Sequence, residues 1–191
     1  MSTATLPTPV PPTPLMTGEE FLALHGDESG VELVEGRVVR YPMPGAKHGK
    51  VCAKATFYLT KYVMEHDLGQ VMSNDTFVRT AKEPDSFRGA DVCFISYARL
   101  PKEQELPRGP IPTPDLIVEV RSPTDRMKAM IEKAYEYLDV GVAVVVQLFP
   151  ETQTAVVFRP DDIPQPFPSD AELTLPDVLP GFSVPVRSFF E

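Results

Sequence analysis

The chain has 191 residues, of which 42% are hydrophobic, 24% are charged and 22 are proline, which is typical of one soluble globular domain with unusually many prolines. It contains no uncharged apolar stretch of about 18 residues, and residues 1–15 lack the basic and apolar regions of a secretory signal, so we expect a cytoplasmic protein without a membrane span. The net charge of −9 argues against a protein whose whole surface coats nucleic acid, but it leaves room for a local basic groove.

The two cysteines, Cys52 and Cys93, are too few for a disulfide framework. They also lack the spacing that is typical of zinc ligands. The cysteine pattern therefore favours a reducing compartment and argues against a zinc site.

The first fifteen residues contain five prolines and no apolar period, so residues 1–15 are expected to be an extended or disordered leader before a single domain over 16–191. Thr17 and Glu20 have the spacing of a capping box and predict a short helix that ends near Gly26. Two β-rich runs around Glu35-Gly36 then predict a hairpin over residues 31–41.

Residues 45–65 have the 3.6-residue period of an amphipathic helix. Its other face carries four lysines that lie within about 60° of one another: Lys47, Lys50, Lys54 and Lys61. Such a face is either an ordinary solvated surface or a stripe that contacts the phosphates of DNA.

The rest of the chain predicts strands at 70–78, 91–96, 116–121, 142–149 and 154–159. Between the third and fourth of these, Thr124 predicts a helix N-cap with Asp125 in the first turn, and the helix should stop before Gly141. The last residues are expected to pack as an edge segment. These elements predict an α/β or α+β domain with a central mixed sheet flanked by helices.

Two acidic residues occupy unusual places in this pattern. Glu119 lies within an apolar strand, on the face that Ile117 and Arg121 share, and Asp91 enters another apolar strand. A buried carboxylate needs a cation, which is either a basic side chain or a metal ion. Two carboxylates on neighbouring strands suit Mg²⁺ or Mn²⁺, so we expect Asp91 and Glu119 to be metal ligands.

A fixed cation would complete such a site. Arg121 stays protonated and can clamp a phosphate, whereas Lys133 on the following helix can orient or deprotonate a water molecule. The alternative is that Glu119 forms a structural ion pair with one of them.

Several short segments form a recognisable series. They are Thr17-Gly18-Glu19-Glu20-Phe21, Val31-Glu32-Leu33-Val34-Glu35-Gly36, His48, Asp91-Val92, Pro114-Asp115-Leu116, Glu119-Val120, Ser122-Pro123-Thr124, Lys133, Tyr137, Gly141-Val142 and Leu179-Pro180-Gly181-Phe182. Together they resemble the Uma2 family of the PD-(D/E)XK nuclease superfamily. The resemblance covers nearly everything after the leader, and the spacing from Asp115 to Gly141 is its most specific part.

The resemblance implies a restriction-endonuclease-like core that cleaves DNA with a divalent metal held by Asp91 and Glu119. It implies Glu32 as an upstream acid. Arg121 stands where the superfamily's strand lysine is expected, so the cation role passes to Lys133. Ala90 replaces the usual proline before the first aspartate.

Four further residues have two interpretations each. His48 is either structural or catalytic, and Asp115 is either a strand-entry cap or a third ligand. Asp125 is most simply a first-turn acid, and Tyr137 is more simply packing than catalysis.

Three functions remain open from the sequence. The first is a Mg²⁺-dependent endodeoxyribonuclease, which would usefully be a twofold homodimer when it cuts both strands. The second is a noncatalytic interaction module that keeps the nuclease fold. The third is a small-molecule phosphohydrolase with a narrow pocket.

Overall fold

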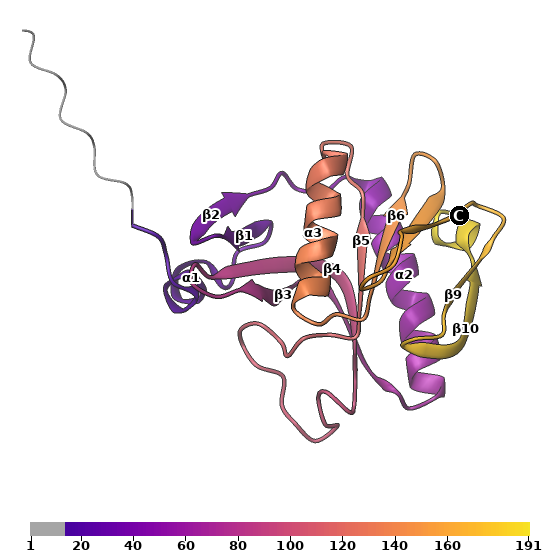
Figure 1. Cartoon of the computed structure of the whole chain (residues 1–191), viewed down its shortest axis with the longest axis horizontal. Coiled ribbons are helices and arrows are strands. Elements are labelled where there is room, and N and C mark those ends of the chain that lie inside the picture. Colours follow the sequence, from indigo (N-terminus) through magenta and orange to yellow (C-terminus); the bar gives the residue numbers. More distant parts are fainter. Residues whose placement is uncertain (1–13) are drawn as a thin grey trace, which may run out of the picture.

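A mixed sheet of eight strands lies at the centre of the molecule, as the sequence predicts (Figure 1). The structure is a computed structural model that describes residues 14–191, so nearly all of the predicted leader lies outside the described residues. The strand order is β2-β1-β4-β5-β6-β7-β8, and β3 pairs with β4. The strands are β1 (Val31–Val34), β2 (Arg37–Arg40), β3 (Gly69–Ala81), β4 (Ser86–Ser96), β5 (Leu116–Val120), β6 (Val144–Phe149), β7 (Thr154–Phe158) and β8 (Gln165–Phe167).

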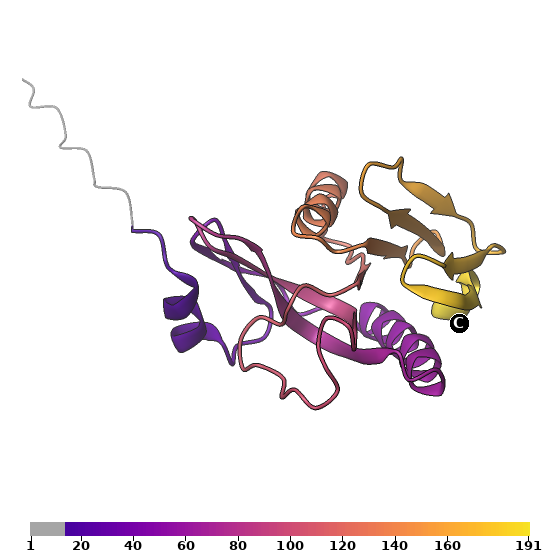
Figure 2. The same cartoon turned by 60° about the horizontal axis from the view of Figure 1, so that its bottom comes forward.

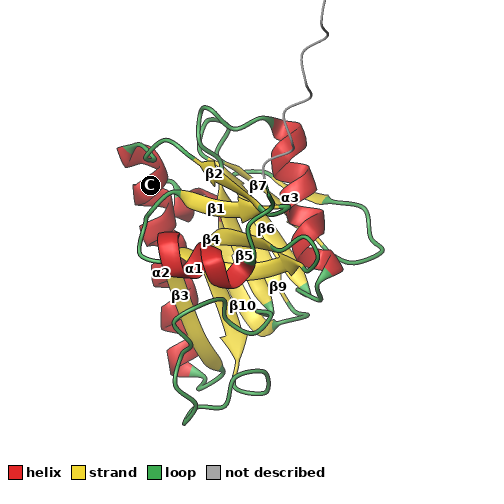
Figure 3. Cartoon of the chain, turned by 90° about the vertical axis from the view of Figure 1, so that its left-hand side faces the viewer, coloured by secondary structure: helices red, strands yellow, loops and turns green. Residues whose placement is uncertain are grey.

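Helices α2 (Ala46–Glu65) and α3 (Met127–Asp139) lie on opposite faces of this sheet (Figures 2 and 3). Leu116, Val118 and Val120 of β5 pack in the same core as α2, whereas Ile117 packs in the core that includes α3. This confirms the alternation predicted for β5, which places Glu119 on the α3 side. Strands β5 and β6 are parallel, and α3 is the crossover between them.

Helix α1 (Gly18–His25) begins with the predicted capping box. The Glu20 amide donates to the Thr17 hydroxyl at 3.2 Å, and the Thr17 amide donates to the Glu20 carboxylate at 2.9 Å. Phe21 anchors this helix in a small core with Leu33 and Phe87. No helix in residues 14–191 is long and apolar enough to cross a membrane.

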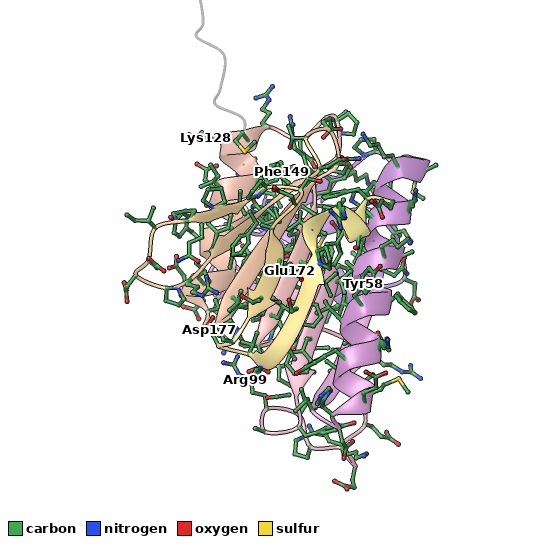
Figure 4. The ribbon with its side chains drawn as sticks, turned by 90° about the vertical axis from the view of Figure 1, so that its right-hand side faces the viewer. Tyr58, Arg99, Lys128, Phe149, Glu172 and Asp177 are labelled. Atoms are coloured by element: carbon green, nitrogen blue, oxygen red, sulfur yellow. The ribbon has the colours of Figure 1, made fainter. Side chains whose placement is uncertain are left out.

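The C-terminal residues form a second layer over α2 and not the predicted edge segment. Strands β9 (Glu172–Leu175) and β10 (Leu179–Pro185) pair with each other, and the 3₁₀ helix η1 (Val186–Phe189) follows. Tyr58 of α2 packs edge-on against Phe189 with ring centroids 5.5 Å apart. Figure 4 shows this layer, in yellow, beside α2. The apolar residues of the tail are therefore core residues.

Helix α3 begins later than predicted. Its N-cap is Arg126, not Thr124, and no side chain caps it. Asp125 precedes the helix, where its carboxylate accepts a hydrogen bond from the Ser122 amide at 2.7 Å, so it caps a turn and is not a first-turn acid. Tyr137 of α3 is fully buried, whereas Tyr135 is 42% exposed, so Tyr137 lies on the face of the helix that packs against the sheet.

The largest difference between the predicted and the observed strands concerns β4, which was predicted over residues 91–96. It begins at Ser86 and forms a long hairpin with β3, so Asp91 lies in the middle of a strand and not at its entry. Pro84 and Asp85 belong to the hairpin turn between the two strands, which extends both strands beyond their predicted limits.

Candidate active site

The candidate site lies where one edge of β4 changes partner. On this edge β4 pairs with β1 at Phe87 and with β5 from Val92 onward. Between these two pairings, the backbone groups of Gly89 form hydrogen bonds with side chains instead of with a neighbouring strand. The Gly89 amide donates to Glu32 at 3.0 Å, and its carbonyl accepts from Lys133 at 2.9 Å. The break in strand pairing thus gathers functional side chains around β4.

Glu119 is one of the two buried acids of this group, together with Glu32. It is 8% exposed, and its two oxygens accept hydrogen bonds from Lys133 and from the Tyr137 hydroxyl, each at 3.0 Å. Burial raises the pKa of Glu119 to about 8, and the attraction of Lys133 opposes this only in part. The Glu119 carboxyl therefore lies in a low-dielectric site, where a nearby cation would strongly stabilise its ionised form.

Lys133 connects two acids from different parts of the chain. Its ammonium lies 3.0 Å from Glu119 and 3.1 Å from Glu32. Burial acts to lower the pKa of Lys133, but the two carboxylates hold it well above its usual range. Lys133 is accordingly a charged hydrogen-bond donor in this state and not a neutral base.

Arg88 fixes Glu32 from the other side. It donates to Glu32 at 3.0 Å and makes two further hydrogen bonds to Glu136 of α3, at 2.7 and 2.5 Å. Burial alone would raise the pKa of Glu32, but Lys133 and Arg88 outweigh it and lower this pKa. Glu32 is thus an ionised carboxylate between two cations.

Replacement of Arg88 by leucine is expected to destabilise the fold by about 3–5 kcal/mol, because it leaves the carboxylate of Glu136 without its cation and that of Glu32 with Lys133 alone. Urea unfolding measures the change in the free energy of unfolding. Arg159→Leu is the matched control, because its partner Asp177 is 45% exposed and such pairs contribute at most about 1 kcal/mol. Equal losses in the two variants would contradict the role given to Arg88.

Asp91 faces the first turn of α2. Its Oδ2 accepts a hydrogen bond from the Val120 amide at 2.7 Å and lies 3.3 Å from His48 Nε2. Burial acts to lower the pKa of His48, but Asp91 outweighs it and raises this pKa. His48 is thus a direct partner of the acid, which favours a functional position over a simple helix-end contact.

A cavity of about 430 Å³ opens onto these groups. Its lining includes the acids and bases Glu32, His48, Arg88, Asp91, Glu119 and Lys133. The cavity is open to solvent beside these charged groups, and Glu119 is paired with Lys133 rather than Arg121. Glu119 thus forms the ion pair that the sequence offered as an alternative, with Lys133 as its partner, and this pair borders an open cavity.

The structure places two groups of predicted residues away from the cavity. Arg121 follows the last residue of β5 and its guanidinium lies 4.0 Å from Glu151. Among the described residues, the arginines that line the cavity are Arg88 and Arg126 and not Arg121. The lysine stripe also lies outside the lining. Lys47, Lys50 and Lys61 are exposed and Lys54 is half-buried. Asp115 pairs with Arg99 at 2.9 Å and accepts from the Ser96 amide, which is the strand-entry role.

Sequence reasoning missed several cavity residues, among them Asp75, Arg88 and Gln147. Asp75 lies in an irregular part of β3 beside Gly89, and burial raises its pKa. Gln147 is 1% exposed and lies beside Glu119 on β6, and its amide oxygen has no hydrogen-bond partner among residues 14–191. A glutamine within an otherwise apolar central strand was the signal that could have identified it.

The donor set of the cavity suits a hard divalent cation. Asp91 and Glu119 present carboxylate oxygens from adjacent strands, and Glu32 and Asp75 add two more carboxylates to the same lining. Mg²⁺ and Mn²⁺ prefer such oxygens, together with water and substrate phosphate. The residues present therefore fit the metal that the sequence predicts.

Comparison with known proteins identifies a shared fold and a family for this chain. A solved structure described as "a putative nuclease belonging to DUF820" from Anabaena variabilis ATCC 29413 shares the fold, with a TM-score of 0.80 and 22% identity over 92% of this chain and 97% of that chain. No curated protein matches the chain. The family model Uma2, described as "Putative restriction endonuclease", matches residues 19–187, which include every acid and base of the cavity. The chain therefore belongs to the Uma2 family.

Proposed function

We propose that the protein is a Mg²⁺- or Mn²⁺-dependent endodeoxyribonuclease that hydrolyses phosphodiester bonds. The observation that carries this proposal is the convergence of Asp91, Glu119 and Lys133 on one open cavity. Two carboxylates with a lysine are the groups that metal-assisted phosphodiester hydrolysis needs.

Each residue has a separate role in this proposal. Asp91 and Glu119 hold the ion, which supplies a Lewis acid that activates water and neutralises charge on the phosphate. Glu32 assists by holding Lys133 in place, and Lys133 donates a hydrogen bond that orients the water or the scissile phosphate. Tyr137 fixes the second oxygen of Glu119.

The lysine stripe would guide the DNA backbone to the cavity. His48 lines the cavity, and its helical neighbours Lys47 and Lys50 are exposed beside it. Lys61 lies fourteen residues along the helix from Lys47, or about 21 Å, which is the scale of several phosphates along a strand. An acidic protein can bind DNA through such a confined basic surface.

Two further parts of the proposal concern the context of the reaction. A homodimer would present two cavities to the two strands of a duplex. A cytoplasmic location would give the enzyme access to DNA and to millimolar-scale Mg²⁺.

Cleavage of supercoiled plasmid with Mg²⁺ or Mn²⁺ tests the proposal. We expect the wild-type protein to nick or linearise the plasmid, and the Asp91→Asn and Glu119→Ala variants to give no cleavage above background. Asp177→Asn, a change of an exposed carboxylate far along the chain, is the matched control and should cleave like wild type. Equal cleavage by all four proteins would assign the activity to a contaminant and refute the proposal.

A further inference from the structure

A second group of potential metal ligands lies beside the acids of the cavity. His48 and Cys52 are one turn apart on α2, and His48 Nδ1 lies 3.4 Å from the Cys52 sulfur. His48 Nε2 lies 3.3 Å from Asp91 Oδ2. One ligand atom from each of the three side chains lies within 4.8 Å of the other two. Helix α2 and strand β4 thus bring a nitrogen, a sulfur and an oxygen donor together.

These donors differ from those that Mg²⁺ prefers. Bonds of about 2.0–2.3 Å to a tetrahedral zinc ion place neighbouring ligand atoms roughly 3.3–3.7 Å apart, so separations of up to 4.8 Å need to close by about 1.5 Å at most. A thiolate and an imidazole select zinc, cobalt or cadmium over magnesium. Three protein ligands leave the fourth position of a tetrahedral ion for water, which is the arrangement of an open zinc site.

We propose that His48, Cys52 and Asp91 form a binding site for a thiophilic divalent cation such as Zn²⁺. On binding, the Cys52 sulfur loses its proton to solvent and forms a bond to the ion. One imidazole nitrogen and one Asp91 oxygen supply the other protein ligands. The site was not visible in the cysteine spacing, because its single cysteine combines with a histidine four residues before it and an acid from a distant strand.

The shared ligand Asp91 gives this site a consequence for activity. Asp91 cannot serve both ions in full, so a thiophilic ion at His48 and Cys52 competes with Mg²⁺ for it. Zn²⁺ is therefore expected to inhibit Mg²⁺-dependent cleavage, and a Cys52→Ser variant should need at least about tenfold more Zn²⁺ for the same inhibition. This competition rests on the proposed nuclease function, whereas binding of the ion does not.

Titration of the metal-free protein with Co²⁺ tests the binding directly. A cobalt–thiolate bond gives a charge-transfer absorption in the near ultraviolet, and we expect this band to saturate at one Co²⁺ per chain. The band should disappear in Cys52→Ser and weaken in His48→Ala. Cys93→Ser is the matched control, because Cys93 is fully buried in the core and its loss should leave the band unchanged.

The outcomes separate this inference from the proposed function. A Co²⁺ band in Glu119→Gln, together with absent cleavage, supports the thiophilic site as a separate feature. A band in a wild-type protein that cuts no DNA would keep the site and refute the nuclease. Absence of the band in folded wild type, or an equal band in folded Cys52→Ser, overturns the site, with circular dichroism confirming that each protein is folded.

Discussion

The Lys133→Met protein is expected to cut plasmid DNA at least about 100-fold more slowly than wild type at saturating Mg²⁺. In the described residues, Lys133 is the cation that contacts both Glu32 and Glu119. Methionine keeps most of the side-chain volume but removes the charge and the donor. The reaction then loses the group that orients water or phosphate, while Asp91 and Glu119 remain to hold the ion.

Lys128→Met is the matched control for this prediction. Lys128 lies on the same helix, but its side chain is 87% exposed and pairs only with Glu132, so this variant should cut like wild type. A thermal unfolding curve with Mg²⁺ checks that Lys133→Met is folded. Mg²⁺ should raise the melting temperature of Lys133→Met at least as much as that of wild type, because the ion offsets the missing positive charge. Cleavage at the wild-type rate by the folded variant would remove Lys133 from the mechanism.

The arrangement of the sheet explains why residues so distant in sequence meet. The edge of β4 that faces away from β3 has no strand partner between Phe87 and Val92 in the described residues. Glu32 of β1 lies on one side of this gap and Glu119 of β5 lies on the other. Lys133 of α3 contacts both of these acids. The Gly89 amide donates to Glu32 and the Gly89 carbonyl accepts from Lys133, which in turn donates to Glu119. The same contacts therefore satisfy the backbone hydrogen bonds of β4 and bring the side chains of the site together.

The sequence was sufficient to predict the parts of the site that depend on local periodicity. A carboxylate within an apolar strand indicated Glu119, because period-two alternation places it beside Ile117 on the α3 side. The helix that follows indicated Lys133 by its position on the flank of the apolar face. The ion pair of these two residues was one of the two alternatives considered, and the structure shows that it exists at 3.0 Å in the metal-free chain.

Other parts of the site depend on contacts that periodicity does not encode. Asp91 was expected at the entry of a strand over residues 91–96. In the structure Pro84 and Asp85 lie in a tight hairpin turn, so β4 already begins at Ser86 and Asp91 lies within it. Arg121 was expected in the site because the predicted strand included it, and alternation of side chains along that strand placed it on the face of Glu119. The strand β5 ends one residue earlier, at Val120. Arg88 could not be identified, since its two partners come from β1 and α3.

The Glu119→Gln variant is expected to lose cleavage and yet to be more stable than wild type in the absence of metal. The pKa of Glu119 is about 8 in the folded chain and near its ordinary value of 4.5 in the unfolded chain. Between these two values the folded state binds more protons, so the stability of wild type falls as pH rises. Glutamine resembles the protonated carboxyl and does not titrate. The gain from Glu119→Gln should therefore be small near pH 4 and grow to a few kcal/mol, to order of magnitude, above pH 8.

Urea unfolding of both proteins at pH 4, 6 and 8.5, with a chelator present, measures this difference. Glu132→Gln is the matched control, because Glu132 is a 58% exposed carboxylate on α3 and its replacement should change stability little at any of these pH values. Mg²⁺ at pH 8.5 should stabilise wild type and reduce the advantage of Glu119→Gln, because the ion binds the ionised carboxylate. A gain that does not change between pH 4 and 8.5 would show that Glu119 keeps an ordinary pKa. Burial of this acid would then have no energetic cost for a metal ion to offset, and its place in an apolar strand would need another explanation.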